Sequence, residues 1–241
     1  MNDLYEISQA FISYMPTLAE EDIQLSTILN SFCNISLSMK EKFIPILDQL
    51  LPFLNKYIYA DIGFKVEDAA LAEYIPEEND SKKDLNKVGS VTFNVGTHSA
   101  KISLQTFALQ NKILAYNSFN DIAVNMKESF CPYIETLLKY AKDLITFKYS
   151  RKIRKIAVKS IESALAACKN EEQKKFIIDS MTEPLLNEFD RMNKLKFAKD
   201  LKSITKHLNL IILEIKDANT LSENFVGGIY KHLSIAANTI K

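Results

Sequence analysis

Apolar residues recur three and four positions apart over most of this chain, which is the spacing of one face of an α-helix. The predicted helices cover residues 4–14, 22–37, a stretch that begins near 42, a pair that begins near 106 and near 130, and then 149–168, 171–191, 196–216 and 222–239. The helices follow one another as pairs joined by short turns. The chain is therefore predicted to be mainly α-helical.

The segment between Asp61 and Leu104 departs from this helical pattern. Residues 72–87 (AEYIPEENDSKKDLNK) are polar, charged and aperiodic, which predicts a flexible loop. Residues 90–104 (SVTFNVGTHSAKISL) alternate apolar and polar side chains on either side of Gly96-Thr97-His98, which predicts a β-hairpin. The sequence thus predicts an insertion over residues 60–104 that consists of a loop and a hairpin.

The apolar faces of the helices define the expected core. The residues assigned to it include Ile23, Phe43, Leu47, Leu50, Leu54, Tyr57, Val124, Phe176, Met181 and Leu185. Pro52 is expected to bend or shorten the helix that begins near residue 42, because proline removes a helical hydrogen bond. Asn170, followed three positions later by Gln173, resembles a capping box and predicts a helix start at this point.

One phrase occurs twice in the chain, as MKEKFIPILDQLL at residues 39–51 and as MKESFCPYIETLL at residues 126–138. Such a recurrence indicates an internal repeat. Each predicted second helix has a phenylalanine in its first turns, at Phe43, Phe130, Phe176 and Phe225, and the last two intervals are 46 and 49 residues. These intervals lie near the period of about 40–47 residues that is typical of HEAT or armadillo repeats.

The helices and the repeat together predict an all-α fold, a HEAT-repeat α-solenoid. We expect a right-handed superhelix of about four antiparallel helix pairs, with one β-hairpin insertion. Residues 1–241 are predicted to form a single array. Because neither end has the polar face of a capping repeat, we expect the array to be a fragment of a longer protein.

Composition and charge narrow the possible functions. Glycine is scarce, with 5 residues, which disfavours β-sandwiches and nucleotide-binding folds that need glycine turns and phosphate loops. Thirty basic residues balance thirty acidic ones, so the total charge does not indicate a nucleic-acid partner. No apolar run approaches the ~18 residues of a membrane span, and the acidic N-terminus is unlike a signal peptide. We expect a protein of the cytosol or nucleus that binds neither membrane nor nucleic acid.

The sequence shows no catalytic, cofactor or metal site. Cys33, Cys131 and Cys168 stand in unrelated contexts and are interpreted as reduced core residues. The histidines have no metal-type spacing to one another or to cysteine. Phosphate loops and nucleophile elbows are missing, so the chain is predicted not to be an enzyme and to need no cofactor.

Three stretches of the sequence resemble the importin-beta (karyopherin-beta) family, on the branch of Ran-binding protein 5, also called importin 5. Residues 104–145 are similar to a repeat of that branch in which a helix pair meets at an "LKEGF.PY.E" turn. Residues 90–104 stand where the branch carries an extended segment and a second strand. Residues 4–47 follow the same order of helix, acidic connector and helix.

The resemblance implies a segment of a nuclear transport receptor that binds cargo proteins and has no catalytic activity. It implies partners that carry basic nuclear localisation signals, Phe-Gly nucleoporins, and Ran-GTP bound through other parts of the parent protein. A protein of this family shuttles between cytoplasm and nucleus through nuclear pores. A different class of protein, a HEAT-repeat scaffold of the phosphatase regulatory or chromosome-organising type, is the alternative, and a helical enzyme fragment is a third.

Polar stripes on the predicted second helices are the candidate cargo site. The residues are Asp48, Glu128, Glu135, Asp179, Glu183, Asn187 and Asp190. Carboxylates along a helix wall would attract the ammonium groups of a basic import signal. The alternative interpretation is that these are ordinary solvated helix faces.

Residues 148–159 (KYSRKIRKIAVK) form a strip of positive charge, opposite in sign to the acidic stripes. It could contact an acidic partner or nucleic acid. The plainer interpretation, which we favour, is that its lysines and arginines are the solvent-facing positions of a helix whose core residues are Ile153, Ile156 and Ala157.

Overall fold

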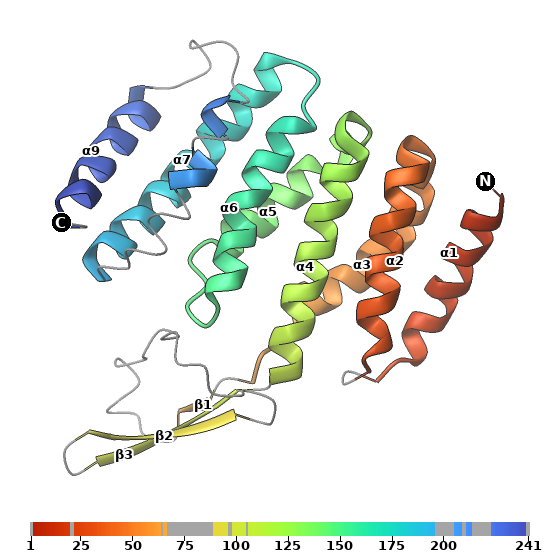
Figure 1. The fold of residues 1–241 in the computed structure, drawn as a ribbon, viewed down its shortest axis with the longest axis horizontal. Coiled ribbons are helices and arrows are strands. Elements are labelled where there is room, and N and C mark those ends of the chain that lie inside the picture. Colours follow the sequence, from red (N-terminus) through yellow and green to blue (C-terminus); the bar gives the residue numbers. More distant parts are fainter. Residues whose placement is uncertain are drawn as a thin grey trace. The chain divides into compact units, whose positions relative to one another are not determined.

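The computed structural model describes residues 2–19, 22–63, 65–66, 89–95, 98–104, 106–195, 205–208, 211–213 and 223–239. The α-helices are α1 (Asn2–Tyr14), α2 (Gln24–Met39), α3 (Ile44–Ile58), α4 (Thr106–Met126), α5 (Ile134–Leu144), α6 (Arg151–Ala166), α7 (Glu171–Leu195) and α9 (Glu223–Thr239) (Figure 1). Short 3₁₀ helices η1 (Met15–Thr17), η2 (Lys40–Phe43) and η4 (Lys127–Tyr133) follow α1, α2 and α4. The predicted helices within the described residues are confirmed, with ends within a few residues of those expected from the sequence. Most of the predicted helix over residues 196–216 lies outside the described residues.

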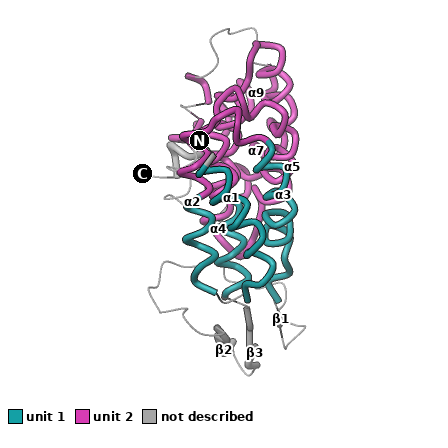
Figure 2. The backbone as a smooth tube through the Cα atoms, turned by 90° about the vertical axis from the view of Figure 1, so that its right-hand side faces the viewer, with its two compact units in different colours: residues 1–31, 45–116 teal, residues 32–44, 117–241 magenta. Residues whose placement is uncertain are grey.

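The chain divides into two compact units, each made of two segments of sequence (Figure 2). Unit 1 contains residues 1–31 and 45–116, and unit 2 contains residues 32–44 and 117–241. In unit 1 the buried apolar side chains are Met15, Leu25, Ile28, Leu29, Ile46, Leu47, Leu50, Leu54, Tyr57, Ile58, Ile62, Ala108, Ala115 and Tyr116. Lys112 on α4 is also buried there, and its ammonium donates to the carbonyl of Ile58 at the end of α3. A cation at the C-terminus of a helix is favoured by the helix dipole.

The repeated phrase forms the same turn twice. In both copies a helix ends at methionine, the next lysine has a positive φ, and a 3₁₀ helix leads into the second helix: Lys40 has φ 47° and Lys127 has φ 52°. The left-handed conformation reverses the chain within a few residues, and it costs a lysine about 1–2 kcal/mol because of its Cβ. Phe43 and Phe130, three residues later, are fully buried. The burial of the phenylalanine offsets the strain of the lysine.

In unit 2 the two turns pack against each other. The hydroxyl of Tyr133 donates to the carbonyl of Ile44 at 3.4 Å. The side-chain amide of Asn125 on α4 donates to the carbonyl of Cys33 at 2.7 Å and to the Ser36 hydroxyl at 3.2 Å. The repeat is therefore the point at which consecutive helix pairs are joined by polar contacts.

The predicted hairpin region contains three short strands, β1 (Lys65–Val66), β2 (Gly89–Val95) and β3 (His98–Leu104). They form an antiparallel sheet in the order β1–β3–β2, and Val95 pairs with His98 next to the turn. The alternation in the sequence had placed strands on either side of Gly96-Thr97-His98, whereas β3 already begins at His98. Strand β1 was not expected from the sequence, because two residues are too few to show a period. The predicted flexible loop over 72–87 lies outside the described residues.

The helices of unit 2 begin and pack as their local sequences require. Asn170 accepts a hydrogen bond from the backbone of Gln173 at 2.9 Å, which confirms the predicted cap of α7. The Gln173 side chain in return accepts from the backbone N–H of Lys169 at 2.9 Å, one residue earlier than in the usual box. Gly228 on α9 lies so close to Leu186 that a Cβ would come within 2.5 Å of its side chain, so a glycine permits the close packing of α9 on α7.

A buried carboxylate joins α6 and α7. Glu188 is fully buried and lies 3.3 Å from the Nε of Arg154 on α6. Arg191 holds it with two hydrogen bonds, of 2.6 Å and 2.7 Å. Arg154 also donates to the carbonyl of Phe147 at 2.9 Å, so it ties the turn before α6 to the same network. The sequence had assigned Arg154 to the solvent-facing strip; that assignment is wrong, because the arginine is the partner that a buried carboxylate requires.

Two further expectations are wrong. Ile23 is 85% exposed because it precedes the first residue of α2, so it does not share the face of Leu25 and Ile28. Val124 is exposed, since the buried face of α4 is formed by Ile122, Ala123 and Met126. Pro52 lies inside α3, which continues to Ile58, so it does not shorten the helix; the expected bend stays a prediction.

The positive φ at Lys127 leads to a testable prediction. Replacing Lys127 with glycine should keep the free energy of unfolding within about 1 kcal/mol of the original, because the relief of strain is offset by the larger entropy of the unfolded chain. Lys127→Val should lower it by about 1–2 kcal/mol, because a β-branched residue is strongly disfavoured at positive φ. Urea unfolding followed by circular dichroism measures both, and a valine variant as stable as the glycine variant would contradict the assigned turn.

The buried carboxylate leads to a second prediction. Glu188→Gln keeps the shape of the side chain but leaves two arginines without their negative partner, which should lower the free energy of unfolding by about 3–5 kcal/mol. Glu183→Gln, an exposed change on the same helix, is the matched control and should shift it by less than about 0.5 kcal/mol. Equal effects of the two changes in urea titrations would show that Glu188 is not a structural ion partner.

Candidate functional site

Helix α7 presents a polar stripe to solvent. Asp179, Glu183 and Asn187 are exposed and stand four residues apart, so they lie on one face of the helix. The opposite face buries Ile177, Ile178, Met181, Leu185, Phe189 and Met192. Neither Asp179 nor Glu183 forms an ion pair with any residue that the structure describes. Within the described part of the chain, no cation competes with a ligand for these two carboxylates.

Asp190, the last candidate on α7, differs from the others. It forms an ion pair with Lys194 at 2.6 Å, one turn further along the helix. The hydrogen bond from Lys194 holds the pKa of Asp190 below its usual value. A ligand would have to compete with Lys194 for this carboxylate, so Asp190 is a weaker candidate than Asp179 or Glu183.

Two residues of this stripe were not expected from the sequence. Phe176, which the repeat analysis placed in the core beside Phe43 and Phe130, is 58% exposed and lies one turn before Asp179. Ile177 and Ile178 take the core positions instead, and their spacing to Met181 was the signal that could have shown it. Pro184 has no N–H, so it leaves the carbonyl of Ser180 without its helical donor.

The remaining candidates lie on other elements. Glu128 is exposed on η4 and Glu135 is exposed on α5, and α5 packs against α7 within unit 2. Asp48 is exposed on α3 and belongs to unit 1. Unit 2 thus contains six of the seven candidates, in one group of four on α7 and one group of two on η4 and α5. A role of these residues in binding cargo stays a prediction.

The chemistry available at the stripe is electrostatic. Exposed carboxylates one helical turn apart, about 6 Å along the axis, can each accept hydrogen bonds from a lysine or arginine of a ligand. Burial raises the pKa of the Cys33 and Cys168 thiols to about 11. Both are therefore protonated at neutral pH and are poor nucleophiles.

Within the described residues, no cluster of three or more histidine, cysteine, aspartate or glutamate side chains has the geometry to hold a metal ion. None of the described helices combines the length and the apolar character that crossing a bilayer requires.

The exposure of Phe176 gives a prediction that distinguishes a surface residue from a core residue. Phe176→Ala should change the free energy of unfolding by less than about 0.5 kcal/mol. Phe130→Ala, at the position that the repeat made equivalent, should lower it by about 3–5 kcal/mol, because it empties a buried site. If urea titrations show a comparable loss for both variants, Phe176 belongs to the core and not to the stripe.

The fold of this chain is similar to that of known solved structures. No family model and no curated protein sequence matches the chain. The structure is similar to Kap121p, a karyopherin of the importin-beta family, with a TM-score of 0.72 at 17% identity. The alignment covers 97% of this chain and 21% of Kap121p. Kap121p bound to Nup53p gives 0.70 at 18% identity over 97% of this chain, and Kap121p bound to Pho4p gives 0.69 at 18% over 96%.

The chain thus spans about a fifth of the length of the solved structures to which it is similar, with 21% of each covered. At such low identity the likeness concerns the fold. The predicted fold class is confirmed: the chain has the fold of a HEAT-repeat α-solenoid, similar to that of one segment of a karyopherin.

Proposed function

We propose that this chain is a segment of a nuclear transport receptor of the importin-beta type, which binds cargo proteins and catalyses no reaction. The observation that carries the proposal is the similarity of fold to Kap121p over 97% of the chain. Solved structures of that karyopherin bound to Pho4p, Nup53p, Ste12p and the SUMO protease Ulp1p support a protein-binding role for such a fold. The resemblance to the importin 5 branch, on residues 4 to about 168, is the finer part of the proposal.

The proposed cargo site is the stripe on α7, with Glu128 and Glu135 as a second acidic group. The carboxylates of Asp179 and Glu183 are about 6 Å apart along the helix axis. In an extended peptide, residues i and i+2 point to the same side and are about 6.6–6.8 Å apart. A segment with the pattern Lys-x-Lys can therefore place one ammonium on each carboxylate. Pro184 leaves the carbonyl of Ser180 without its helical donor, which adds an uncharged acceptor on the same helix.

The parent receptor would have further partners. Phe-Gly nucleoporins would bind to it, and Ran-GTP would bind through parts outside this segment. Such a receptor would shuttle between the cytoplasm and the nucleus. These partners follow from the family resemblance. The similarity of fold to a karyopherin supports the assignment to that kind of receptor, and through it these partners.

The proposal predicts salt-sensitive binding of a basic peptide. A labelled peptide with a Lys-x-Lys-x-Lys pattern, titrated with the chain and followed by fluorescence anisotropy, should bind more weakly at physiological than at low ionic strength, because charges are screened over about 8 Å at 0.15 M. The Glu135→Lys, Asp179→Lys double variant should bind it about tenfold more weakly, since two attractions become two repulsions.

The control for this experiment is a double variant with the same change in charge on an element that carries none of the candidate residues. Asp3→Lys with Glu6→Lys fits, because both residues are exposed on α1. If both double variants weaken binding equally, the affinity for the peptide depends on the total charge of the chain, and the site is not on the second helices. If no peptide binds at high protein concentration, cargo binding by this segment is refuted and a scaffold function is favoured.

A further inference from the structure

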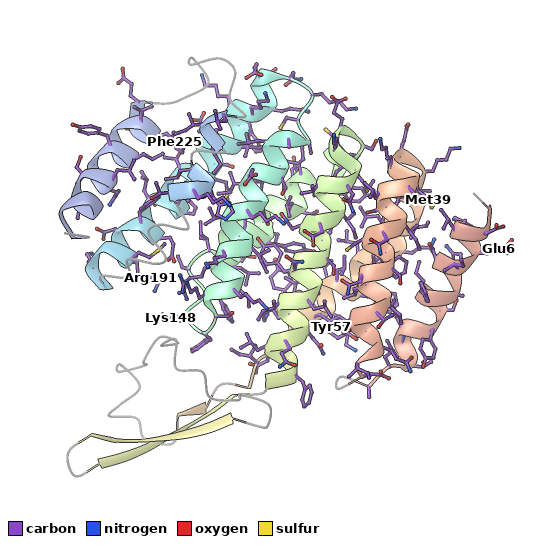
Figure 3. The ribbon with its side chains drawn as sticks, viewed as in Figure 1. Glu6, Met39, Tyr57, Lys148, Arg191 and Phe225 are labelled. Atoms are coloured by element: carbon purple, nitrogen blue, oxygen red, sulfur yellow. The ribbon has the colours of Figure 1, made fainter. Side chains whose placement is uncertain are left out.

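Helix α9 has large apolar residues on two sides. Phe225 and Ile229 are buried, and Figure 3 shows Phe225 on the side of α9 that faces α7. On the other side of the helix, Tyr230 is 76% exposed and Val226 is 50% exposed, and the two stand one turn apart. Two neighbouring apolar side chains in water favour burial against a partner.

Gly227 stands at the centre of this exposed face. A glycine inside a helix costs about 1 kcal/mol relative to alanine. At the adjacent Gly228 the fold requires it, since a Cβ would come within 2.5 Å of Leu186 on α7. At Gly227 the described residues do not, because none of their atoms lies within 4 Å of the position of a Cβ. A glycine there permits the backbone of another helix to approach the exposed face closely.

The charges on this face are arranged symmetrically about Gly227. Glu223 stands four residues before it and Lys231 four residues after it, and both are exposed. Each is about 6 Å from Gly227 along the helix axis and about 40° from it around the axis, on opposite sides. Neither forms an ion pair with a residue that the structure describes. The pKa of Asp190 on α7 is lowered first by its hydrogen bond to Lys194 and less by Lys231, so Lys231 lies near that carboxylate without pairing with it.

A second copy of α9 that runs in the opposite direction matches this face. A twofold axis brings residues equally far from Gly227 to the same height, so Glu223 of one copy meets Lys231 of the other, and the reverse. Tyr230 and Val226 share one edge of the face, so Tyr230 of one copy comes within about 3 Å, along the axis, of Val226 of the other. We propose that the chain forms a symmetric dimer through antiparallel pairing of α9.

A parallel pair of α9 helices fits less well, because it would place like charges side by side at Glu223 and again at Lys231. The antiparallel contact is small, and each exposed ion pair contributes less than about 1 kcal/mol. The dimer is therefore expected to be reversible, and its population should depend on protein concentration and on salt.

Sedimentation equilibrium of the intact chain over a range of protein concentrations tests the proposal. The chain should be a monomer when dilute and a dimer when concentrated, and its dissociation constant should rise with ionic strength. Lys231→Glu should weaken the dimer about tenfold, because both attractions between the copies become repulsions. The double variant Glu223→Lys, Lys231→Glu restores both pairs with their signs exchanged, and its dissociation constant should return to within about twofold of the original.

Two further variants serve as controls, and circular dichroism establishes that each variant is folded. Lys175→Glu makes the same change in charge at an exposed residue of α7 and should leave the dissociation constant within about twofold. Gly227→Leu changes no charge and has room in the monomer, but it should weaken the dimer about tenfold because the new side chain holds the two helices apart.

A chain that stays monomeric at every concentration would overturn the proposal and leave the exposed face of α9 to a different protein or to solvent. A dimer that Lys231→Glu does not weaken, or that the double variant does not restore, would also overturn it. The contact between the copies would then lie on another part of the chain.

Discussion

Each helix of this chain has one apolar face, and only a neighbouring helix can cover it. This constraint explains why the molecule is an array: a single pair would leave an apolar face in water, and each added pair buries one face and exposes the next. The short turns of the repeated phrase satisfy the constraint locally. A left-handed lysine reverses the chain, and a buried phenylalanine three residues later fixes the second helix against the first, at Phe43 and again at Phe130.

Polar contacts then determine how the pairs of unit 2 are held in register. The amide of Asn125 bonds to the backbone of Cys33, and the buried carboxylate of Glu188 bonds to arginines on two helices. Apolar packing tolerates small sliding of one helix along another, whereas a buried charge without its partner costs several kcal/mol. Glu188 therefore specifies one arrangement of α6 and α7, and it anchors the turn before α6 through Arg154.

The same scaffold exposes a stripe of polar and acidic side chains on α7 within unit 2. The stripe of Asp179, Glu183 and Asn187 has little local compensation, and Phe176 gives it an apolar edge. In a chain with no net charge, this stripe favours a cationic partner, and its exposed side chains do not contribute to the core.

The sequence by itself determined the helices, because their apolar period is regular and their boundaries carry local signals such as Asn170 and the "MKE.F" phrase. It also determined the HEAT-type fold and the stripe on α7, since residues four apart must share a face. Only the tertiary structure decided which apolar residues are buried, as Phe176 and Ile23 show, because an aromatic ring near the edge of a face is covered only if a neighbouring helix reaches it. It alone decided that Arg154 faces Glu188, because these residues belong to different helices and no spacing along the chain records which helices meet.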